Sequence, residues 1–433
     1  MKILMVNVHS VRNAGDDALL QAAMQQLRRH FPGGTITLAI NDRAGYPGPE
    51  PTVDSFLPWF RRQDKDGPPL RTWRWLAIPG RLLQLWLYAL LYRKRGHLPT
   101  FALTAEQHNL LQAYAHADMV VSCPGGYLYS TGKLGLWFLV TLLTLAYPVW
   151  LGKPVYLLPQ TIGPLQYGWE RWLLRRLLPQ IRQIYVRDEY SCALLETLGI
   201  HHPQLHVTPD LAFGYQADDH AVGVNLLRQL GIDLDNDQPL LGVTLINWAG
   251  MERSFQGQEA YEAAVASAIR AFVTAHGGRA VLFAQVRGPA LAEDDRVPAR
   301  RVQQHLSDLD DRIVVVEAEV TTAQLQAAYS YMTLFMGSRL HSNIFALSAG
   351  VPVIAIAYLP KTRGVMRTLG LEQWVVDIAS VEGSALYALL SQLYTNRAAV
   401  RAQVQTAMAA QQAAISAMSH ALATDFHQEQ GQR

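Results

Sequence analysis

The stretch from Met332 to Lys361 constrains the fold more than any other part of this 433-residue chain. Its first apolar run, Met332 to Met336, breaks at Gly337-Ser338, and a helical pattern then extends to Gly350. A second apolar run follows from Val351 to Tyr358. The order strand, turn, helix, strand, with a glycine at the C-terminus of the helix, predicts one unit of an open parallel sheet.

Cationic side chains fall at the ends of both of these strands. Arg339 and His341 follow the first strand, and Lys361 follows the second. Ligands of an open parallel sheet bind outside the carboxyl ends of its strands, where helix N-termini present N–H groups, and arginine can grip a carboxylate or phosphate with two hydrogen bonds. The pattern predicts a site for a small, multiply charged anion. The alternative is that Arg339 pairs with a local carboxylate and His341 caps the helix. No Asp or Glu lies between Val320 and Gly370, so a carboxylate partner would come from elsewhere in the chain.

Length and composition exclude several classes of protein. The chain is long enough for two domains of about 200 residues each. A formal charge of +2 indicates no nucleic-acid partner. Two cysteines without CxxC or CxxH spacing argue for a reducing compartment and against a disulfide or zinc scaffold. No secretion signal is evident in MKILMVNVHS, so we expect a cytoplasmic protein.

Polar or glycine-containing loops follow the strands predicted in the first half. The strand Lys2 to Val8 leads into a loop with Asn13 and Asp16 at the entrance of a helix predicted over 18–30. This loop either receives a ligand or caps the helix through Asp16 or Asp17. Gly125 and Gly126 follow a strand predicted over 118–123, where they permit either close approach of a ligand to the backbone or a tight turn.

Two further strand ends in the first half carry candidate residues. Gln160 lies in the loop Pro159 to Pro164 after the strand Val155 to Leu158. Arg187 ends the strand Ile184 to Val186, where it either binds an anion or forms a local ion pair with Asp188 or Glu189. Between Asp42 and Pro69 we expect an irregular loop.

Two apolar stretches raise the question of a membrane. We interpret Leu134 to Leu151 as a buried crossover helix, because the run is short for a span and Pro148 interrupts it. The stretch from Arg71 to Arg95 mixes arginine, leucine and tryptophan, including Trp73 and Trp75. It either lies on a membrane surface as a peripheral contact or forms an amphipathic helix packed on the core with its arginines facing water.

The two halves share one plan, in which strands alternate with helices. We therefore predict an α/β protein with two Rossmann-like, doubly wound lobes facing a cleft. The predicted boundaries are 1–214 for the first lobe, 215–238 for a polar connection, 239–395 for the second lobe and 396–433 for a helical tail. In the second lobe, Asn247 follows a strand predicted over 240–246 and is a candidate substrate contact or plain loop residue.

Several stretches together resemble the polysaccharide pyruvyl transferase family. They extend from about Val6 to Lys361 and read NAGDDALL, PGGYLYS, LPQTIGPL, YVRDEYSCALLETLG, VTPDLAF and GSRLHSNIFALSAGVPVIAIAYLPK. The resemblance implies a glycosyltransferase-B-like fold. It also implies transfer of pyruvate from phosphoenolpyruvate onto two hydroxyls of a sugar, with formation of a cyclic ketal and release of phosphate.

The resemblance also implies roles for particular residues. Arg339 and His341 of the SRLH motif, and Arg187 of the RD motif, match positions expected to bind the donor or to catalyse. Ser338 and Lys361 join them on the donor side, which we expect in the second lobe. We expect the acceptor side in the first lobe. The candidate acceptor or cleft residues, there and at the remaining strand ends, are Asn13, Asp16, Gly125, Gly126, Gln160 and Asn247.

The expected partners are phosphoenolpyruvate as co-substrate and a sugar or lipid-linked oligosaccharide as acceptor. We expect no cofactor and no metal, because no cluster of carboxylates indicates one. Two other functions compete with this prediction. One is a nucleotide-sugar-dependent glycosyltransferase of the same shape, and the other is a noncatalytic glycan-binding or membrane-binding component of polysaccharide assembly.

Overall fold

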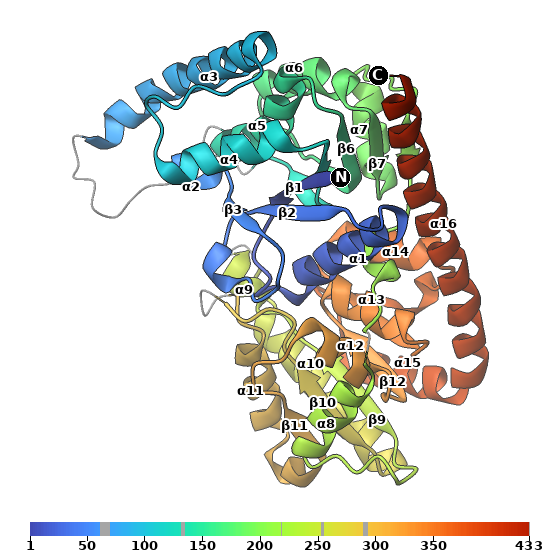
Figure 1. Ribbon diagram of the computed structural model, residues 1–433. Helices are drawn as coiled ribbons and strands as arrows, with labels where there is room; N and C mark the ends of the chain where they lie inside the picture. The colour runs from blue at the N-terminus through green and yellow to red at the C-terminus, as the bar shows by residue number, and fades with distance from the viewer. Residues whose placement is uncertain (61–69, 131–134, 218, 253–254, 289–292, 433) are drawn as a thin grey trace. The chain divides into compact units, whose positions relative to one another are not determined.

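The computed structural model describes residues 1–433 except 61–69, 131–134, 218, 253–254, 289–292 and 433. The chain forms two compact units, each built around its own sheet (Figure 1). The first unit contains Met1–Val11, Leu19–Leu211 and Ala414–Arg433. The second contains Arg12–Ala18 and Ala212–Ala413.

The first unit is built on a parallel sheet in the order β3-β2-β1-β4-β6-β7-β8, with β5 paired to β6. The chain leaves the central β1 in one direction, through β2 and β3, and later returns to its other side with β4. This reversal is the switch point at which doubly wound sheets bind ligands. The strands are β1 (Lys2–Val8), β2 (Thr35–Ile40), β3 (Thr52–Asp54), β4 (Met119–Ser122), β5 (Gly125–Leu128), β6 (Val155–Ile162), β7 (Gln183–Val186) and β8 (Leu205–Val207).

Helices of the first unit connect these strands. Helix α5 confirms the predicted buried crossover: most of its side chains are buried, because both it and the strands beside it lie inside the unit. Among the described residues, no helix is long and apolar enough to cross a membrane. The helices are α1 (Ala14–His30), whose first turn belongs to the second unit, α2 (Leu57–Phe60), α3 (Leu70–Arg95), α4 (Ala105–His116), α5 (Leu136–Leu151), α6 (Gly168–Leu177) and α7 (Glu189–Thr197).

The second unit has a parallel sheet in the order β11-β10-β9-β12-β13-β14, the strand order of dinucleotide-binding folds. Its switch point lies between β9 and β12. Aromatic rings fill the core beside it, with centroids of Tyr329 and Phe335 4.5 Å apart. The strands are β9 (Leu240–Thr244), β10 (Arg279–Phe283), β11 (Ile313–Val315), β12 (Leu334–Gly337), β13 (Val353–Ala357) and β14 (Val375–Asp377).

The helices of the second unit include one that we did not predict. Helix α8 lies within 215–238, which we expected to be a connection, and it packs on α12. A Cβ on Gly223 would overlap the backbone of Ala327, so this close packing depends on the glycine. The helices are α8 (Ala221–Gln229), α9 (Trp248–Met251), α10 (Gln258–His276), α11 (Arg296–His305), α12 (Thr322–Tyr329), α13 (Leu340–Ser348), α14 (Pro360–Thr368), α15 (Gly383–Thr395) and α16 (Arg397–Gln432).

The unit boundaries differ from the predicted ones. The second unit runs from Ala212 to Ala413, so it includes the expected connection 215–238 and the first part of the expected tail 396–433. Two short segments also lie outside the unit expected for them. Arg12–Ala18 belongs to the second unit although the strands before and after it belong to the first. The C-terminal part of α16, from Ala414, belongs to the first unit. It buries apolar side chains such as Leu422 and Phe426, and Asp425 accepts a hydrogen bond of 2.7 Å from the Tyr156 hydroxyl. The tail therefore completes the first unit.

Two local predictions are also wrong. The described part of 42–69 contains strand β3 and helix α2, so it is not wholly irregular. Gly125 and Gly126, where ligand approach and a tight turn were both left open, begin strand β5, and Gly125 has a φ of +152° that glycine permits. Helix α1 begins at Ala14, four residues earlier than predicted.

Candidate functional site

The strongest candidate site lies at the switch point of the second unit, where β9 and β12 end side by side. Thr244 and Gly337 are paired across these strands, and the Ser338 N–H donates to the Thr244 carbonyl at 3.0 Å. Helix α13 begins directly afterwards, with Arg339 as its N-cap residue and His341 in its first turn. The N–H groups of this turn have no acceptor within the helix and carry its positive partial charge.

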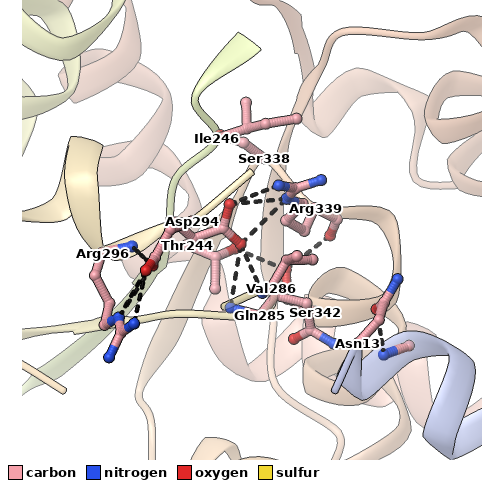
Figure 2. A network of polar contacts seen from close by, with 12 residues as sticks. Asn13, Thr244, Ile246, Gln285, Val286, Asp294, Arg296, Ser338, Arg339 and Ser342 are labelled. Carbon is pink, nitrogen blue, oxygen red and sulfur yellow. Dashed lines mark hydrogen bonds and ion pairs between the residues drawn. The ribbon is translucent and has the colours of Figure 1, made fainter. Parts of the chain in front are cut away.

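Arg339, labelled in Figure 2, is held by a buried ion pair. Its partner is Asp295, which precedes α11. The Arg339 Nη2 donates to Oδ1 at 2.6 Å and its Nε donates to both carboxylate oxygens at 3.1 Å. The backbone N–H groups of Gln285 and Val286 donate to Oδ2 at 3.2 and 2.9 Å. Arg339 therefore does pair with a carboxylate, but with a distant one and not with the local one of the alternative, and α13 has no side-chain capping hydrogen bond. The partner is 44 positions away in sequence.

Burial and charge pairing act in opposite directions on this pair. Burial raises the pKa of Asp295, while the Arg339 guanidinium and the backbone N–H groups of Gln285 and Val286 counter that rise. Burial alone would lower the pKa of Arg339, but the Asp295 carboxylate outweighs it and the pKa is raised, with Tyr358 as a further contributor. The Arg339 side chain is 9% exposed and that of Asp295 is 0% exposed. A guanidinium in such a pair has one orientation and little net charge left for a ligand. Its contribution to an anion site is therefore directional more than electrostatic.

The two serines and the asparagine of the SRLHSN segment form hydrogen-bonding contacts within the second unit. Ser338 is fully buried and its hydroxyl lies 2.6 Å from that of Tyr261. The Ser342 hydroxyl lies 2.6 Å from that of Thr244 and the Asn343 amide donates to the Gly337 carbonyl at 3.1 Å. These contacts lock α13 onto the ends of β9 and β12.

His341 packs against the N-terminal segment that belongs to this unit. A Cβ on Gly15 would overlap Nδ1 of the His341 ring, so only glycine fits beside it. The Gly15 N–H donates to Oδ1 of Asn13 at 2.9 Å, and Asn13 forms an isolated bridge with Val286. The side chain of Asn13 thus caps the start of α1, a role for which Asp16 and Asp17 were the candidates. Asp16 lies in the first turn of α1.

Asn247 and Lys361 lie at the ends of neighbouring connections in the same unit. Asn247 is the N-cap residue of the short helix α9 and is 8% exposed. Lys361 is exposed in the first turn of α14, at the carboxyl end of β13. Between these elements the rings of Trp248 and Tyr358 lie 4.8 Å apart. The structure therefore gathers Asn13, Asn247, Arg339, His341 and Lys361 along the carboxyl edge of one sheet.

Arg187 lies in the first unit, at the carboxyl end of β7. Its Nη1 donates to Asp210 at 2.7 Å and its Nε donates to the Thr161 hydroxyl at 2.9 Å. Asp188 instead caps α7 by accepting the Ser191 N–H at 2.7 Å. The predicted local ion pair with Asp188 or Glu189 is therefore wrong, because the carboxylate that neutralises Arg187 comes from the next strand end.

Gly125, Gly126 and Gln160 lie at this same edge of the first sheet. A Cβ on Gly126 would sit 3.3 Å from Nη2 of Arg187, so the glycine leaves room for the guanidinium. Gln160 is fully buried within β6 and its amide donates to the Cys123 carbonyl. Its side-chain oxygen has no hydrogen-bond partner in the part of the chain that the structure describes.

Sequence reasoning missed several residues of these two edges. In the second unit these are Asp295 and Tyr358. In the first they are Asn7 and His9, which line a small pocket at the end of β1 together with Trp137. Asn7 has φ of +57°, rare outside glycine, and its side chain bonds Ser122 and Thr144. Two polar residues interrupting the apolar run MVNVHS were the available signal for this pocket.

Comparisons with known proteins identify the family of this chain. The profile described as polysaccharide pyruvyl transferase matches residues 13–360. The amylovoran biosynthesis protein AmsJ of Erwinia amylovora is 24% identical over 417 residues, which cover 94% of this chain and 95% of that protein.

Solved structures share the fold. UDP-GlcNAc 2-epimerase from Neisseria meningitidis aligns with a TM-score of 0.55 at 11% identity, covering 99% of this chain and all of that one. Sucrose-phosphate synthase from Thermosynechococcus elongatus aligns with a TM-score of 0.51 at 13% identity, covering both chains completely. At these identities the likeness concerns the fold alone, and it confirms the predicted glycosyltransferase-B-like class with two parallel-sheet α/β units. Since the family profile spans most of the sequence, from the Asn13 loop to the start of α14, this chain belongs to the polysaccharide pyruvyl transferase family.

Proposed function

We propose that the protein transfers pyruvate from phosphoenolpyruvate onto two hydroxyls of a sugar, forming a cyclic ketal and releasing phosphate. The acceptor is a sugar of a polysaccharide or of its lipid-linked precursor. Membership of the family and the similarity to an amylovoran biosynthesis protein support a transferase of polysaccharide biosynthesis. The observation that carries the finer proposal is the place of His341, in the first turn of α13 at the switch point of the second sheet.

The reaction needs one proton donor and two proton acceptors. A proton added to the methylene carbon of phosphoenolpyruvate makes it a methyl group and leaves the neighbouring carbon electrophilic. One sugar hydroxyl adds to that carbon, phosphate departs with its bonding electron pair, and a second hydroxyl then adds. The two hydroxyl protons balance the proton on the methyl group and the proton taken up by phosphate. Histidine exchanges protons near neutral pH, so we assign His341 as the general acid or proton shuttle.

We assign binding of the carboxylate and phosphate of phosphoenolpyruvate to the groups around His341. The first-turn N–H groups of α13 suit a carboxylate or phosphate. We propose that Asp295 holds Arg339 so that its guanidinium meets the donor in one orientation, and that Lys361 contributes a further positive charge. Arg187 enters the proposal through its match to the RD motif of the family, as a donor-binding and catalytic residue of the first unit.

The decisive experiment measures phosphate release from phosphoenolpyruvate in the presence of a panel of glycosides. For His341→Ala we expect turnover to fall about 10²–10⁴-fold, the range of a lost general acid, while phosphoenolpyruvate binding remains measurable by calorimetry. His305→Ala, at an exposed position of α11, is the matched control and should retain activity.

The same panel separates the competing functions. Release of nucleotide from a nucleotide sugar, without phosphate release from phosphoenolpyruvate, would identify a glycosyltransferase. Absence of turnover with every donor would favour a noncatalytic component of polysaccharide assembly. Wild-type phosphate release by His341→Ala would remove this histidine from the mechanism.

A further inference from the structure

The outward face of α3 exposes large apolar side chains in a row. Leu83, Trp86 and Leu87 have 56%, 46% and 41% of their surface exposed, and they lie three and four positions apart on one side of the helix. The side chains of 70–77, including Trp73 and Trp75, lie outside the described residues, so this face is defined by Leu83, Trp86 and Leu87 alone. Figure 1 shows α3 at the periphery of its own unit.

The opposite face of the same helix is packed into the first unit. Leu85, Tyr88 and Ala89 are at most 2% exposed and belong to its hydrophobic core, where α3 contacts α5. The Tyr88 hydroxyl donates to the Phe101 carbonyl in the loop after the helix. This second face already attaches α3 firmly, so the exposed row is not needed for folding. When a helix is apolar on both faces and only one face is buried in the fold, the exposed face is expected to bind a partner.

The charge of the residues around this exposed row indicates what kind of partner it binds. From Leu70 to Ala105 the sequence contains no Asp or Glu, and α3 ends in the exposed triplet Arg93, Lys94 and Arg95. Phe101, 66% exposed, lies in the loop that Tyr88 holds beside the helix. A leucine and tryptophan row beside a cluster of bases is the composition of helices that lie in the interface of an anionic bilayer.

We propose that α3 docks the protein onto an anionic lipid surface, with Leu83, Trp86 and Leu87 inserted at the headgroup level and Arg93, Lys94 and Arg95 on the lipid phosphates. Tryptophan favours this depth because its ring is apolar while its N–H remains hydrated. The inference stands on surface chemistry alone and does not depend on the reaction proposed above. In a polysaccharide pathway with lipid-linked acceptors, it places the enzyme at the surface where those acceptors lie.

The test is cosedimentation of the full-length protein with vesicles. We compare phosphatidylcholine alone with phosphatidylcholine containing 30% phosphatidylglycerol, at low and at high salt. We expect binding to the anionic vesicles only, weakened by salt. The triple variant Leu83→Gln, Trp86→Gln, Leu87→Gln should bind at least tenfold more weakly. Neutralising Arg93, Lys94 and Arg95 to Gln should weaken binding about 100-fold, since each base near the surface contributes about fivefold.

Control variants keep the result interpretable. Tyr331→Gln removes an exposed aromatic ring from the second unit, and Arg228→Gln removes an exposed charge there. Both should bind vesicles like the wild type. All variants should keep the wild-type melting temperature, because the changed side chains are exposed. Phosphate release from soluble glycosides should also be unchanged by the α3 variants, which separates failure of docking from failure of the enzymatic proposal.

Three outcomes would overturn the proposal. Equal binding to neutral and anionic vesicles would remove the role of charge, and absence of binding to both would remove the lipid surface. Dimerisation that the Leu83, Trp86 and Leu87 variant abolishes, seen by analytical ultracentrifugation, would show that a second copy of the chain covers α3 instead.

Discussion

At the scale of single residues, the buried pair between Arg339 and Asp295 contributes to stability. For Asp295→Asn we expect a loss of about 3–5 kcal/mol in the free energy of unfolding, because the change leaves a guanidinium buried without its carboxylate. Urea denaturation measures this loss. The double variant Asp295→Asn, Arg339→Gln should recover part of it, since no buried charge then remains unpaired.

The matched control for this pair is Asp308→Asn. Asp308 also binds an arginine, Arg270, but both side chains are largely exposed, so stability should hardly change. Equal effects of Asp295→Asn and Asp308→Asn would contradict the assignment of the Arg339 pair as a buried, stabilising contact.

Gly15 is the residue on which the position of His341 depends most directly. For Gly15→Ala we expect the added methyl group to displace the imidazole, because it would overlap Nδ1. Since a misplacement of about 1 Å can cost about 10²-fold in rate, turnover should fall by that order while binding of phosphoenolpyruvate changes little. Phosphate-release kinetics measure the effect. Gly168→Ala, where a Cβ meets nothing within 4 Å, is the control, and equal activities of the two variants would argue against positioning by Gly15.

His9 predicts how stability depends on pH. Burial against Tyr127 and Trp137 lowers the pKa of His9 from 6.5 to about 4. The folded protein therefore holds His9 neutral, whereas the unfolded chain protonates it below pH 6.5. The stability contributed by the neutral ring is present above pH 6.5 and is lost as the pH falls towards 4.

The variant His9→Phe keeps an aromatic ring but has no titratable group. Between pH 7 and pH 4.5 the wild type should lose about 2–3 kcal/mol more than the variant, as measured by denaturation at each pH. Losses that are the same in both proteins would show that His9 titrates normally in the folded state.

At the scale of elements, α16 shows how a predicted tail becomes part of a unit. For Leu422→Ala we expect a loss of about 2–5 kcal/mol, because Leu422 is 2% exposed and its truncation leaves a cavity. Thermal and chemical denaturation measure it. Gln428→Ala, at an exposed position of the same helix, should have little effect. If Leu422→Ala were equally mild, the end of α16 would not stabilise the first unit.

Elements with long, regular patterns were predicted best. Helix α5 is the clearest case, because its 16 mostly apolar residues lie within the stretch Leu134 to Leu151 that was interpreted as a buried crossover helix. The short elements β3, β5 and α8 were missed, because three to nine residues carry too little periodicity to separate them from loops. Gly223 shows the difficulty: in sequence it reads as a loop residue, yet it permits the contact of α8 with α12.

At the scale of the whole molecule, each unit is assembled from segments distant in sequence. The second unit takes Arg12–Ala18 from the start of the chain, and the first takes Ala414–Arg433 from its end. The two sheets have matching strand orders around β1 and β9, so the order in which strands occur along the chain predicts where each sheet has its switch point. The strand order does not predict which loops lie at that switch point.

Sequence alone determined the alternation of strands and helices, the two-sheet α/β class and the placement of Arg339, His341 and Lys361 at strand ends, because these follow from local periodicity and from the direction of parallel strands. Only the tertiary structure decided that Asp295 neutralises Arg339, that Asp210 neutralises Arg187, that Gly15 supports His341 and that α3 exposes Trp86. These contacts join residues far apart in the chain. Their energies depend on burial and on distances across packed elements, and no local pattern records either quantity.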